Sequence, residues 1–187
     1  MKVGVLALQG AFAAHSTVLE RLGVATTEVR LPEQLADIDA LVLPGGESTT
    51  ISMIAQRTGI WGPLGEFVRS GRPVLGTCAG LILLASEVLD GRSDQTSLGA
   101  LDVSVRRNAF GRQLASFEMD VPVVGLDEPF HAVCIRAPAV ERLGDGVEVL
   151  AEVDGHPALV RQGAMMGAIF HPELADDPRL HELFLAG

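Results

Sequence analysis

Residues 73–84 read P-V-L-G-T-C-A-G-L-I-L-L. The apolar run Pro73–Gly76 is typical of a buried strand, and the apolar residues of Leu81–Leu89 favour a helix. The turn between them has the form G-x-C-x-G, the cysteine counterpart of a nucleophile elbow. Glycines suit this turn because side chains two positions before and after the nucleophile would obstruct the sharp bend. The stretch therefore predicts a strand, a tight turn that presents Cys78, and a helix.

The rest of the N-terminal half shows the same alternation of strands and helices. Strands are predicted at Val3–Leu8, Val24–Leu31 and Ala40–Leu43, and helices at Ala11–Leu22, Ser48–Gln56 and Trp61–Arg69. Strands and helices in this order favour a mainly parallel sheet with helices on both faces. We therefore expect an α/β fold of three layers.

Beyond Gly91 the sequence becomes rich in short β-like stretches. Strands are predicted at Val103–Arg106, Phe117–Val124, His131–Arg136, Val147–Val153, Ala158–Arg161 and Met165–Phe170, and a helix at Asp176–Leu185. Turn residues separate the last three strands, which predicts a meander of hairpins that extends the sheet. We see no repeat or linker, so we expect a single domain over residues 1–187 with an antiparallel β-rich C-terminal extension.

Composition narrows the classes of partner. The 187 residues are 48% hydrophobic, enough for a real core, and the formal net charge of −10 disfavours binding to nucleic acid or to an anionic membrane. No apolar run reaches the roughly 18 residues of a membrane span, and the N-terminus starts with a strand pattern instead of a signal peptide. We therefore expect a cytoplasmic protein. The two cysteines and the five histidines show no zinc-ligand spacing, so no metal is expected.

Cys78 has two interpretations. A lone cysteine is usually a buried packing residue. Here the flanking glycines and the position before a helix, where free N–H groups favour a thiolate, indicate a nucleophile instead. Cys134 lies in the alternating run His131–Arg136 without a neighbouring glycine, so we interpret it as a packing residue of a strand.

A thiolate nucleophile needs a base, and that base needs a partner that orients it. F-H-P-E at 170–173 supplies both. In an extended chain residues i and i+2 point to the same side, and Pro172 disfavours helix at His171, so Glu173 is expected to hold the His171 ring. The other histidines, His15, His131, His156 and His181, are interpreted as solvated residues on helix or loop edges.

Acyl chemistry also needs N–H donors for a developing oxyanion. One is predicted at the backbone amide of Ala79, directly after Cys78. The loop P-G-G-E-S at 44–48 can supply another, near Gly46, because glycine exposes the main chain. The alternative interpretation is a helix-initiating turn capped by Ser48, and the two are compatible.

Seven segments, in this order, resemble the glutaminase subunit of pyridoxal 5'-phosphate synthase, a class I glutamine amidotransferase. They are V-L-A-L-Q-G at 5–10, L-P-G-G-E-S-T at 43–49, G-T-C-A-G-L-I at 76–82, R-N-A-F-G-R-Q at 107–113, S-F-E at 116–118, I-R-A-P at 135–138 and F-H-P-E-L at 170–174. The G-x-C-x-G and H-P-E motifs are shared by class I amidotransferases in general. The Q-G, R-N-A-F-G-R-Q and I-R-A-P segments are similar to the vitamin B6 branch.

The resemblance implies a flavodoxin-like fold and a triad of Cys78, His171 and Glu173. It implies glutamine contacts at Gly46, Glu47, Ser48, Arg107, Ile135 and Arg136. It also implies hydrolysis of L-glutamine without a cofactor, with ammonia passed to a separate synthase subunit. Two alternatives remain: another elbow-type cysteine hydrolase, such as a small peptidase, and a non-catalytic regulatory module on the same fold.

Overall fold

The computed structural model describes residues 1–92, 94–107 and 116–187, so the segment R-N-A-F-G-R-Q lies outside the described residues except for Arg107. In chain order the elements are β1 (Lys2–Leu6), α1 (Phe12–Arg21), β2 (Ala25–Val29), η1 (Pro32–Asp37), β3 (Ala40–Leu43), α2 (Ser48–Arg57), α3 (Trp61–Val68), β4 (Val74–Thr77), α4 (Ala79–Leu84), β5 (Ala85–Val88), β6 (Leu101–Arg106), β7 (Ser116–Val121), β8 (Phe130–Ile135), β9 (Ala139–Leu143), β10 (Glu148–Val153), β11 (His156–Gln162), β12 (Met165–Ala168), η2 (Pro172–Leu174) and α5 (Arg179–Leu185).

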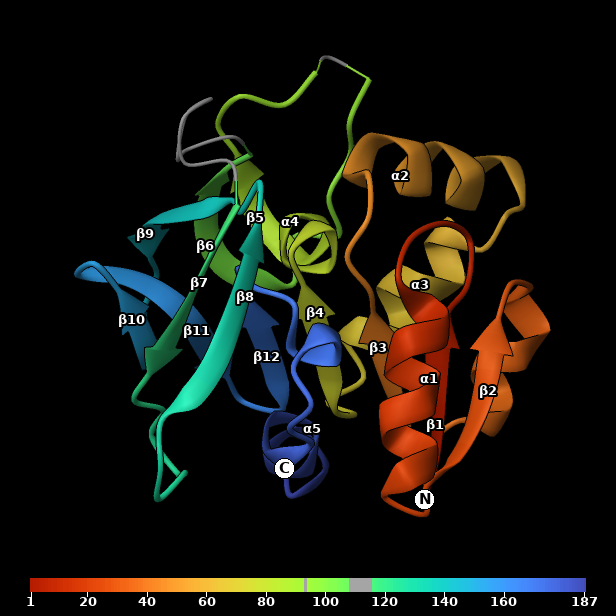
Figure 1. Cartoon of the computed structure of the whole chain (residues 1–187). Coiled ribbons are helices and arrows are strands. Elements are labelled where there is room, and N and C mark those ends of the chain that lie inside the picture. Colours follow the sequence, from red (N-terminus) through yellow and green to blue (C-terminus); the bar gives the residue numbers. More distant parts are fainter. Residues whose placement is uncertain (93, 108–115) are drawn as a thin grey trace.

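The main sheet has the strand order β10-β11-β12-β4-β3-β1-β2 (Figure 1). The five strands from β12 to β2 are parallel to their neighbours. The meander β10-β11-β12 pairs in antiparallel fashion and adds two strands at one edge. The predicted α/β sheet with an antiparallel C-terminal extension is therefore confirmed.

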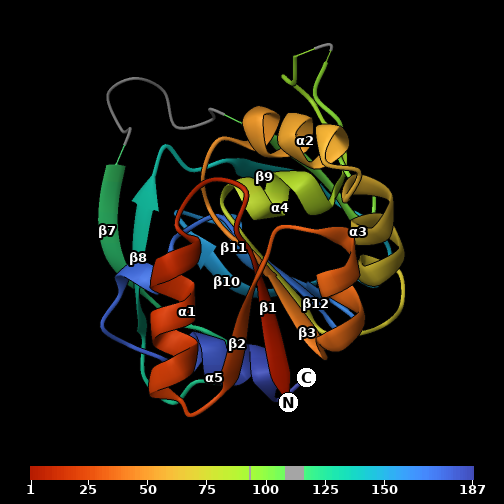
Figure 2. The same cartoon turned by 90° about the vertical axis from the view of Figure 1, so that its right-hand side faces the viewer.

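Helices cover both faces of this sheet. Figure 2 shows α1 and α5 on one side of the strands and α3 on the other. The stripe that α1 buries is His15, Val18 and Leu19, which lie on one face at spacings of three and four residues. The central strands β3 and β4 are mostly apolar, and every residue of both is buried. The core is the space between sheet and helices, which explains the run of apolar residues in each central strand.

Two smaller sheets flank the main one: β5-β6-β9 and the hairpin β7-β8. The predicted helix Leu81–Leu89 is wrong beyond Leu84, because the chain turns extended at Ala85 and β5 pairs in parallel with β6. Apolar runs of this length do not distinguish a buried helix from a strand, and here the partner strand decides. Strand β9 was not predicted. The C-terminal helix starts at Arg179, after Pro178, three residues later than predicted.

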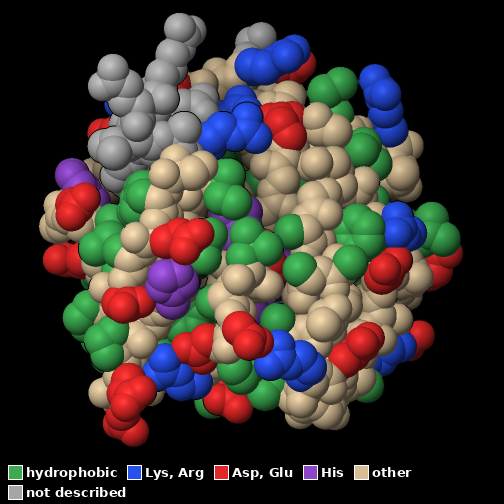
Figure 3. Space-filling model, in the orientation of Figure 1, with side chains coloured by type: hydrophobic (Ala, Val, Ile, Leu, Met, Phe, Trp, Pro, Cys, Tyr) green, Lys and Arg blue, Asp and Glu red, His purple; other side chains and the backbone are tan. Residues whose placement is uncertain are grey.

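The surface carries both signs of charge. On the face seen in Figure 3, acidic and basic side chains are interspersed over much of the molecule. Within the described ranges, no helix combines the length and the apolar character needed to cross a membrane.

The parallel strands place four connecting segments at one edge of the sheet. Strands β1, β3, β4 and β12 run in the same direction, so their carboxyl ends meet there. The residues that follow these strands include Gln9, Gly45, Cys78 and His171. The fold thus brings together segments that are as much as 160 residues apart in sequence, which locates the candidate site.

We expect Gly80→Ala to destabilise the fold, because a Cβ at Gly80 would lie 1.9 Å from the carbonyl oxygen of Leu43. Overpacking of this kind costs roughly 1–3 kcal/mol or more when backbone must shift. The free energy of unfolding from urea titration measures the loss. Gly62→Ala is the matched control: a Cβ there meets no atom within 4 Å apart from its chain neighbours, so stability should change by less than about 1 kcal/mol. Equal stability of the two variants would contradict this account of the elbow.

Candidate active site

Cys78 occupies a strained turn between β4 and α4. Its φ is +49° and its ψ is −100°, a combination that non-glycine residues rarely adopt. The turn is held by the N–H of Cys78, which donates to the carbonyl of Ala168 at 2.8 Å. A Cβ on Gly76 would lie 2.8 Å from the carbonyl oxygen of Gly80, so both glycines are sterically required. The side chain of Cys78 is consequently fixed at the carboxyl edge of the sheet, with 8% exposure.

His171 and Glu173 form a buried pair. The Nδ1 atom of His171 lies 2.7 Å from Oε1 of Glu173, and the residues are 8% and 6% exposed. The backbone N–H of His171 donates to the carbonyl of Val133 in β8 at 2.8 Å, which ties the ring's position to the hairpin. An extended chain was predicted between the two residues, but residues 172–174 form the short 3-10 helix η2. The contact is made by a tight turn, not by alternation along a strand.

The electrostatics favour a protonated ring beside the thiol. Burial alone would lower the pKa of His171, but hydrogen bonds to Cys78 and Glu173 outweigh it and raise that pKa to about 10. Burial works against ionisation of Glu173 as well, yet the hydrogen bond from His171 keeps its pKa below the ordinary value. An ionised carboxylate therefore braces an imidazolium next to Cys78 at neutral pH.

Cys134 has a different environment. It lies on β8 with 1% exposure, and burial raises the pKa of its thiol to about 12. Its thiol therefore stays protonated, which agrees with the prediction of a packing residue.

The glycine loop after β3 approaches the site with bare main chain. A Cβ at Gly45 would lie 2.4 Å from Cε1 of His171, and one at Gly46 would lie 2.5 Å from Oε1 of Gln9. The amide of Gly46 lies beside the pocket, and the amide of Ala79 starts α4, where N–H groups lack an intrahelical acceptor. Gly46 therefore lines the same pocket as Cys78, and Ala79 directly follows Cys78, while their role as oxyanion donors stays a prediction.

Glu47, not Ser48, caps α2. Its carboxylate accepts from the N–H groups of Thr49 at 3.1 Å and Thr50 at 2.7 Å. The interpretation of Ser48 as the cap is wrong, because its hydroxyl accepts instead from Nε2 of Gln95 at 3.0 Å. Burial tends to raise the pKa of Glu47, but these hydrogen bonds lower it overall, so the carboxylate is ionised.

A pocket of about 260 Å³ opens at this edge of the sheet. Its lining is Gln9, Gly46, Glu47, Ser48, Cys78, Ile82, Arg107, Ile135, Arg136 and His171. All six predicted glutamine contacts are in this set, together with two members of the predicted triad. Ala79 and Glu173 adjoin the pocket through Cys78 and His171.

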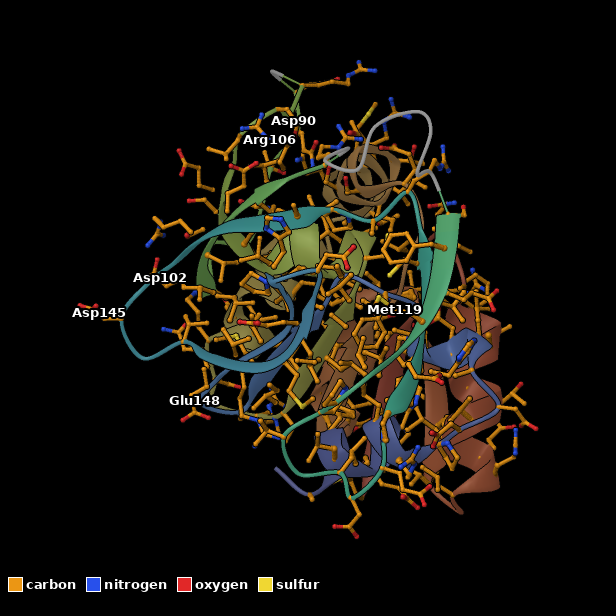
Figure 4. All side chains as sticks on the ribbon, turned by 60° about the vertical axis from the view of Figure 1, so that its left-hand side comes forward. Asp90, Asp102, Arg106, Met119, Asp145 and Glu148 are labelled. Carbon is orange, nitrogen blue, oxygen red and sulfur yellow. The ribbon has the colours of Figure 1, made fainter. Side chains whose placement is uncertain are left out.

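The two arginines of the pocket differ. Arg107 forms an ion pair with Glu47 at 2.7 Å and donates to Oε1 of Gln95, also at 2.7 Å. Its backbone N–H donates to Asp90, which Figure 4 labels next to Arg106 at the end of β6. Arg136 has a φ of +46° and makes no hydrogen bond or ion pair within the part of the chain that the structure describes. Of the two guanidinium groups, that of Arg136 is therefore the one without a partner among the described residues.

Sequence reasoning missed several residues of the site. Gln9 lines the pocket, and its Oε1 accepts from the N–H of Glu47 at 2.7 Å. Its position directly after β1 was the available signal. Gln95 holds Arg107 and Ser48 from a loop without a sequence pattern, so nothing in the sequence pointed to it.

The interpretation of His15 and His181 as solvated residues is wrong, since both have 0% exposure. Each belongs to the buried stripe of its helix: Val18 and Leu19 accompany His15, and Phe184 accompanies His181. The helical spacing of these apolar neighbours was the signal that could have placed them inside. His131 and His156 are exposed, as predicted.

Comparisons with known proteins agree closely. A model of the SNO glutamine amidotransferase family matches residues 5–187. Pyridoxal 5'-phosphate synthase subunit PdxT of Mycobacteroides abscessus is 55% identical over 98% of this chain and 95% of its own length. The subunit of the same name from Roseiflexus sp. is 53% identical over 100% of both chains. A structure described as a glutamine amidotransferase has a TM-score of 0.93 at 52% identity, over 98% of this chain and 97% of that one.

Glu173→Gln should lower the pKa of His171. Removal of the carboxylate takes away a hydrogen bond and a negative charge that both favour the protonated ring, whose pKa is raised to about 10. Titration of the imidazole by NMR measures the change. Glu148→Gln is the control and should leave the titration in place, because Glu148 is an exposed carboxylate on the edge strand β10 (Figure 4) and does not line the pocket. If His171 titrates identically in both variants, Glu173 does not brace it.

Proposed function

The chain belongs to the SNO glutamine amidotransferase family, as its motifs predicted, and we propose that it hydrolyses L-glutamine to L-glutamate and ammonia. The observation that supports this most strongly is the arrangement of Cys78, a protonated His171 and an ionised Glu173 beside a pocket of suitable size. A pair of this kind provides a thiolate nucleophile and a proton donor without an external base.

The reaction starts when the sulfur of Cys78 attacks the carboxamide carbon of glutamine. The carbonyl oxygen becomes an oxyanion, which the amides of Gly46 and Ala79 stabilise. His171 gives its proton to the leaving nitrogen, so that ammonia departs and a γ-glutamyl thioester remains on Cys78. The neutral ring then takes a proton from water, the hydroxide attacks the thioester, and glutamate leaves while the thiolate and the imidazolium are restored. Each step uses a group that lines the pocket or neighbours Cys78 in the chain, and none requires a cofactor.

The pocket recognises a free amino acid by its charges. Arg136 and Arg107 provide guanidinium groups for the α-carboxylate, and the carboxylate of Glu47 is the acceptor for the α-ammonium. Ile135 and the main chain at Gly46 and Ser48 form the walls. Because Glu47 and Arg107 are paired with each other in the free pocket, glutamine replaces an existing ion pair when it binds.

The relatives are named as subunits of pyridoxal 5'-phosphate synthase, which supports a separate synthase subunit as the acceptor of ammonia. We infer that the chain is one glutaminase domain that delivers ammonia to this subunit for vitamin B6 synthesis. Ammonia released without an acceptor is lost, so docking of the synthase is the step that activates the site.

Glutamate release from glutamine tests the function directly. The purified chain should release glutamate slowly alone and faster with the synthase subunit, and Cys78→Ala should lower the rate by roughly a thousandfold or more. Equal activity with and without the synthase would reject activation by docking. No activity in either mixture would reject the glutaminase proposal, and hydrolysis of a peptide or ester instead would favour an elbow-type peptidase.

Arg136→Met should raise the KM for glutamine, because one charge-assisted contact to the carboxylate is lost while the triad is untouched. A contact of this class contributes about 1.5–3 kcal/mol, which corresponds to roughly 10- to 100-fold in kcat/KM. Arg21→Met is the matched control, because Arg21 is an exposed residue at the end of α1 and, within the described ranges, pairs only with exposed Asp176 at the surface. An unchanged KM in Arg136→Met would remove this residue from the proposed binding site.

A further inference from the structure

A second pair of histidines lies buried behind the triad. His15 on α1 and His181 on α5 both have 0% exposure, and Nδ1 of His15 lies 2.9 Å from Nε2 of His181. The two helices lie on the same side of the main sheet (Figure 2). Nothing in the proposed chemistry uses these rings. Burial of two titratable side chains is costly unless their polar atoms are satisfied, so their contacts call for a physical reason.

His15 lies against Glu173 of the triad and against the residue that precedes Cys78. Its Nε2 atom lies 3.2 Å from Oγ1 of Thr77, the residue before Cys78, and 3.2 Å from Oε2 of Glu173. That second carboxylate oxygen accepts no hydrogen bond from the residues that the structure describes. The contact with His15 is therefore electrostatic, while Oε1 of the same carboxylate serves His171.

The surroundings determine where the protons lie. Burial lowers the pKa of both rings, that of His181 to about 3, so both are neutral. A neutral His15 must turn either an N–H or a lone pair toward the carboxylate, and only the N–H is attractive. With its proton on Nε2, His15 donates to Thr77 and its Nδ1 accepts the N–H from Nε2 of His181. The orphaned Nδ1 of His181 is then a bare lone pair, not an unpaired N–H.

We propose that His15 is a positioning residue of the glutaminase site: its Nε2–H holds the carboxylate of Glu173 and the elbow residue Thr77 in one arrangement, and His181 fixes its tautomer. The inference rests on the proposed function for its kinetic consequences. The orientation of the Glu173 carboxylate determines which oxygen faces His171. The N–H of His15 beside Oε2 keeps Oε1 turned toward His171. Loss of that N–H weakens the positioning of the His171 ring by Glu173. His15 itself does not contact the substrate.

The test compares three substitutions at His15. Leucine fills the space but offers no donor, asparagine can place an N–H only toward His181, and glutamine can reach Glu173 and Thr77. In the complex with the synthase subunit, His15→Leu and His15→Asn should lower kcat by about 10- to 100-fold, in line with residues that orient reactive groups, with KM changed less than twofold. His15→Gln should recover most of the loss. His131→Gln, an exposed histidine on β8, is the control.

A pH readout separates positioning from general loss of structure. The groups that face His15 are Thr77 on β4, Glu173 on η2 and His181 on α5, with His171 nearby. A weaker brace destabilises the imidazolium of His171, so the upper limb of the kcat profile should move to lower pH in His15→Leu and His15→Asn and return in His15→Gln. If leucine prevents folding, the asparagine and glutamine pair decides. Equal kcat in that pair overturns the proposal.

A titration of the His171 imidazole in the absence of substrate distinguishes this inference from the proposed function. The imidazole of His171, followed by NMR in the free chain, should titrate at lower pH in His15→Asn than in the parent or in His15→Gln. That outcome supports the positioning role even if the parent releases no glutamate, a result that would reject only the glutaminase proposal. An unchanged titration in His15→Asn rejects the positioning role even if glutaminase activity is present.

Discussion

The site depends on one constraint: two segments of the main chain approach closely, at Gly80 and at Leu43. A Cβ at Gly80 would lie 1.9 Å from the carbonyl oxygen of Leu43, so the start of α4 rests directly on the end of β3. The same closeness recurs one strand further, where a Cβ at Gly10 would lie 1.9 Å from the carbonyl oxygen of Gly45. Because the main-chain segments lie so close together at this edge of the sheet, Cys78 and the glycine loop line one pocket. The positive φ of Cys78 is tolerated because the packing around it fixes the turn.

Much of this could be predicted from local patterns, since each chemical element of the triad lies within a short motif. G-x-C-x-G specified the elbow, and H-P-E placed a base beside a carboxylate even though the connecting backbone is a 3-10 turn. The predictions were wrong where contacts between distant parts of the chain determine the local structure or the burial of a residue. Residues 85–88 became a strand because β6 lies beside them, and His15 and His181 are buried because two helices from opposite ends of the chain bring them together. The spacing of apolar neighbours could have indicated that each histidine is buried, but neither the pairing of β5 with β6 nor the contact between the two rings is encoded within a window of sequence.

The charges of the pocket form a balanced set before any ligand is present. The carboxylate of Glu47 accepts hydrogen bonds from the N–H groups that start α2, and it forms an ion pair with the guanidinium of Arg107. These contacts hold it ionised and in one rotamer. Gln95 fixes Arg107 from the other side. Arg136, by contrast, is held by its backbone geometry and not by a partner side chain among the described residues. The pocket thus combines an ion pair between Glu47 and Arg107 with an arginine that has no partner side chain among the described residues.

The hydrogen bond from the N–H of His171 to the carbonyl of Val133 couples the base to a hairpin outside the main sheet. Two-stranded hairpins are marginally stable on their own, and such units open locally more often than the core. The position of the base is therefore tied to β8 of this hairpin, whereas Cys78 directly follows β4 in the middle of the main sheet. Ile135 at the end of β8 and Arg136 directly after it also line the pocket. A partner that clamps the hairpin would increase the occupancy of the assembled site without touching Cys78.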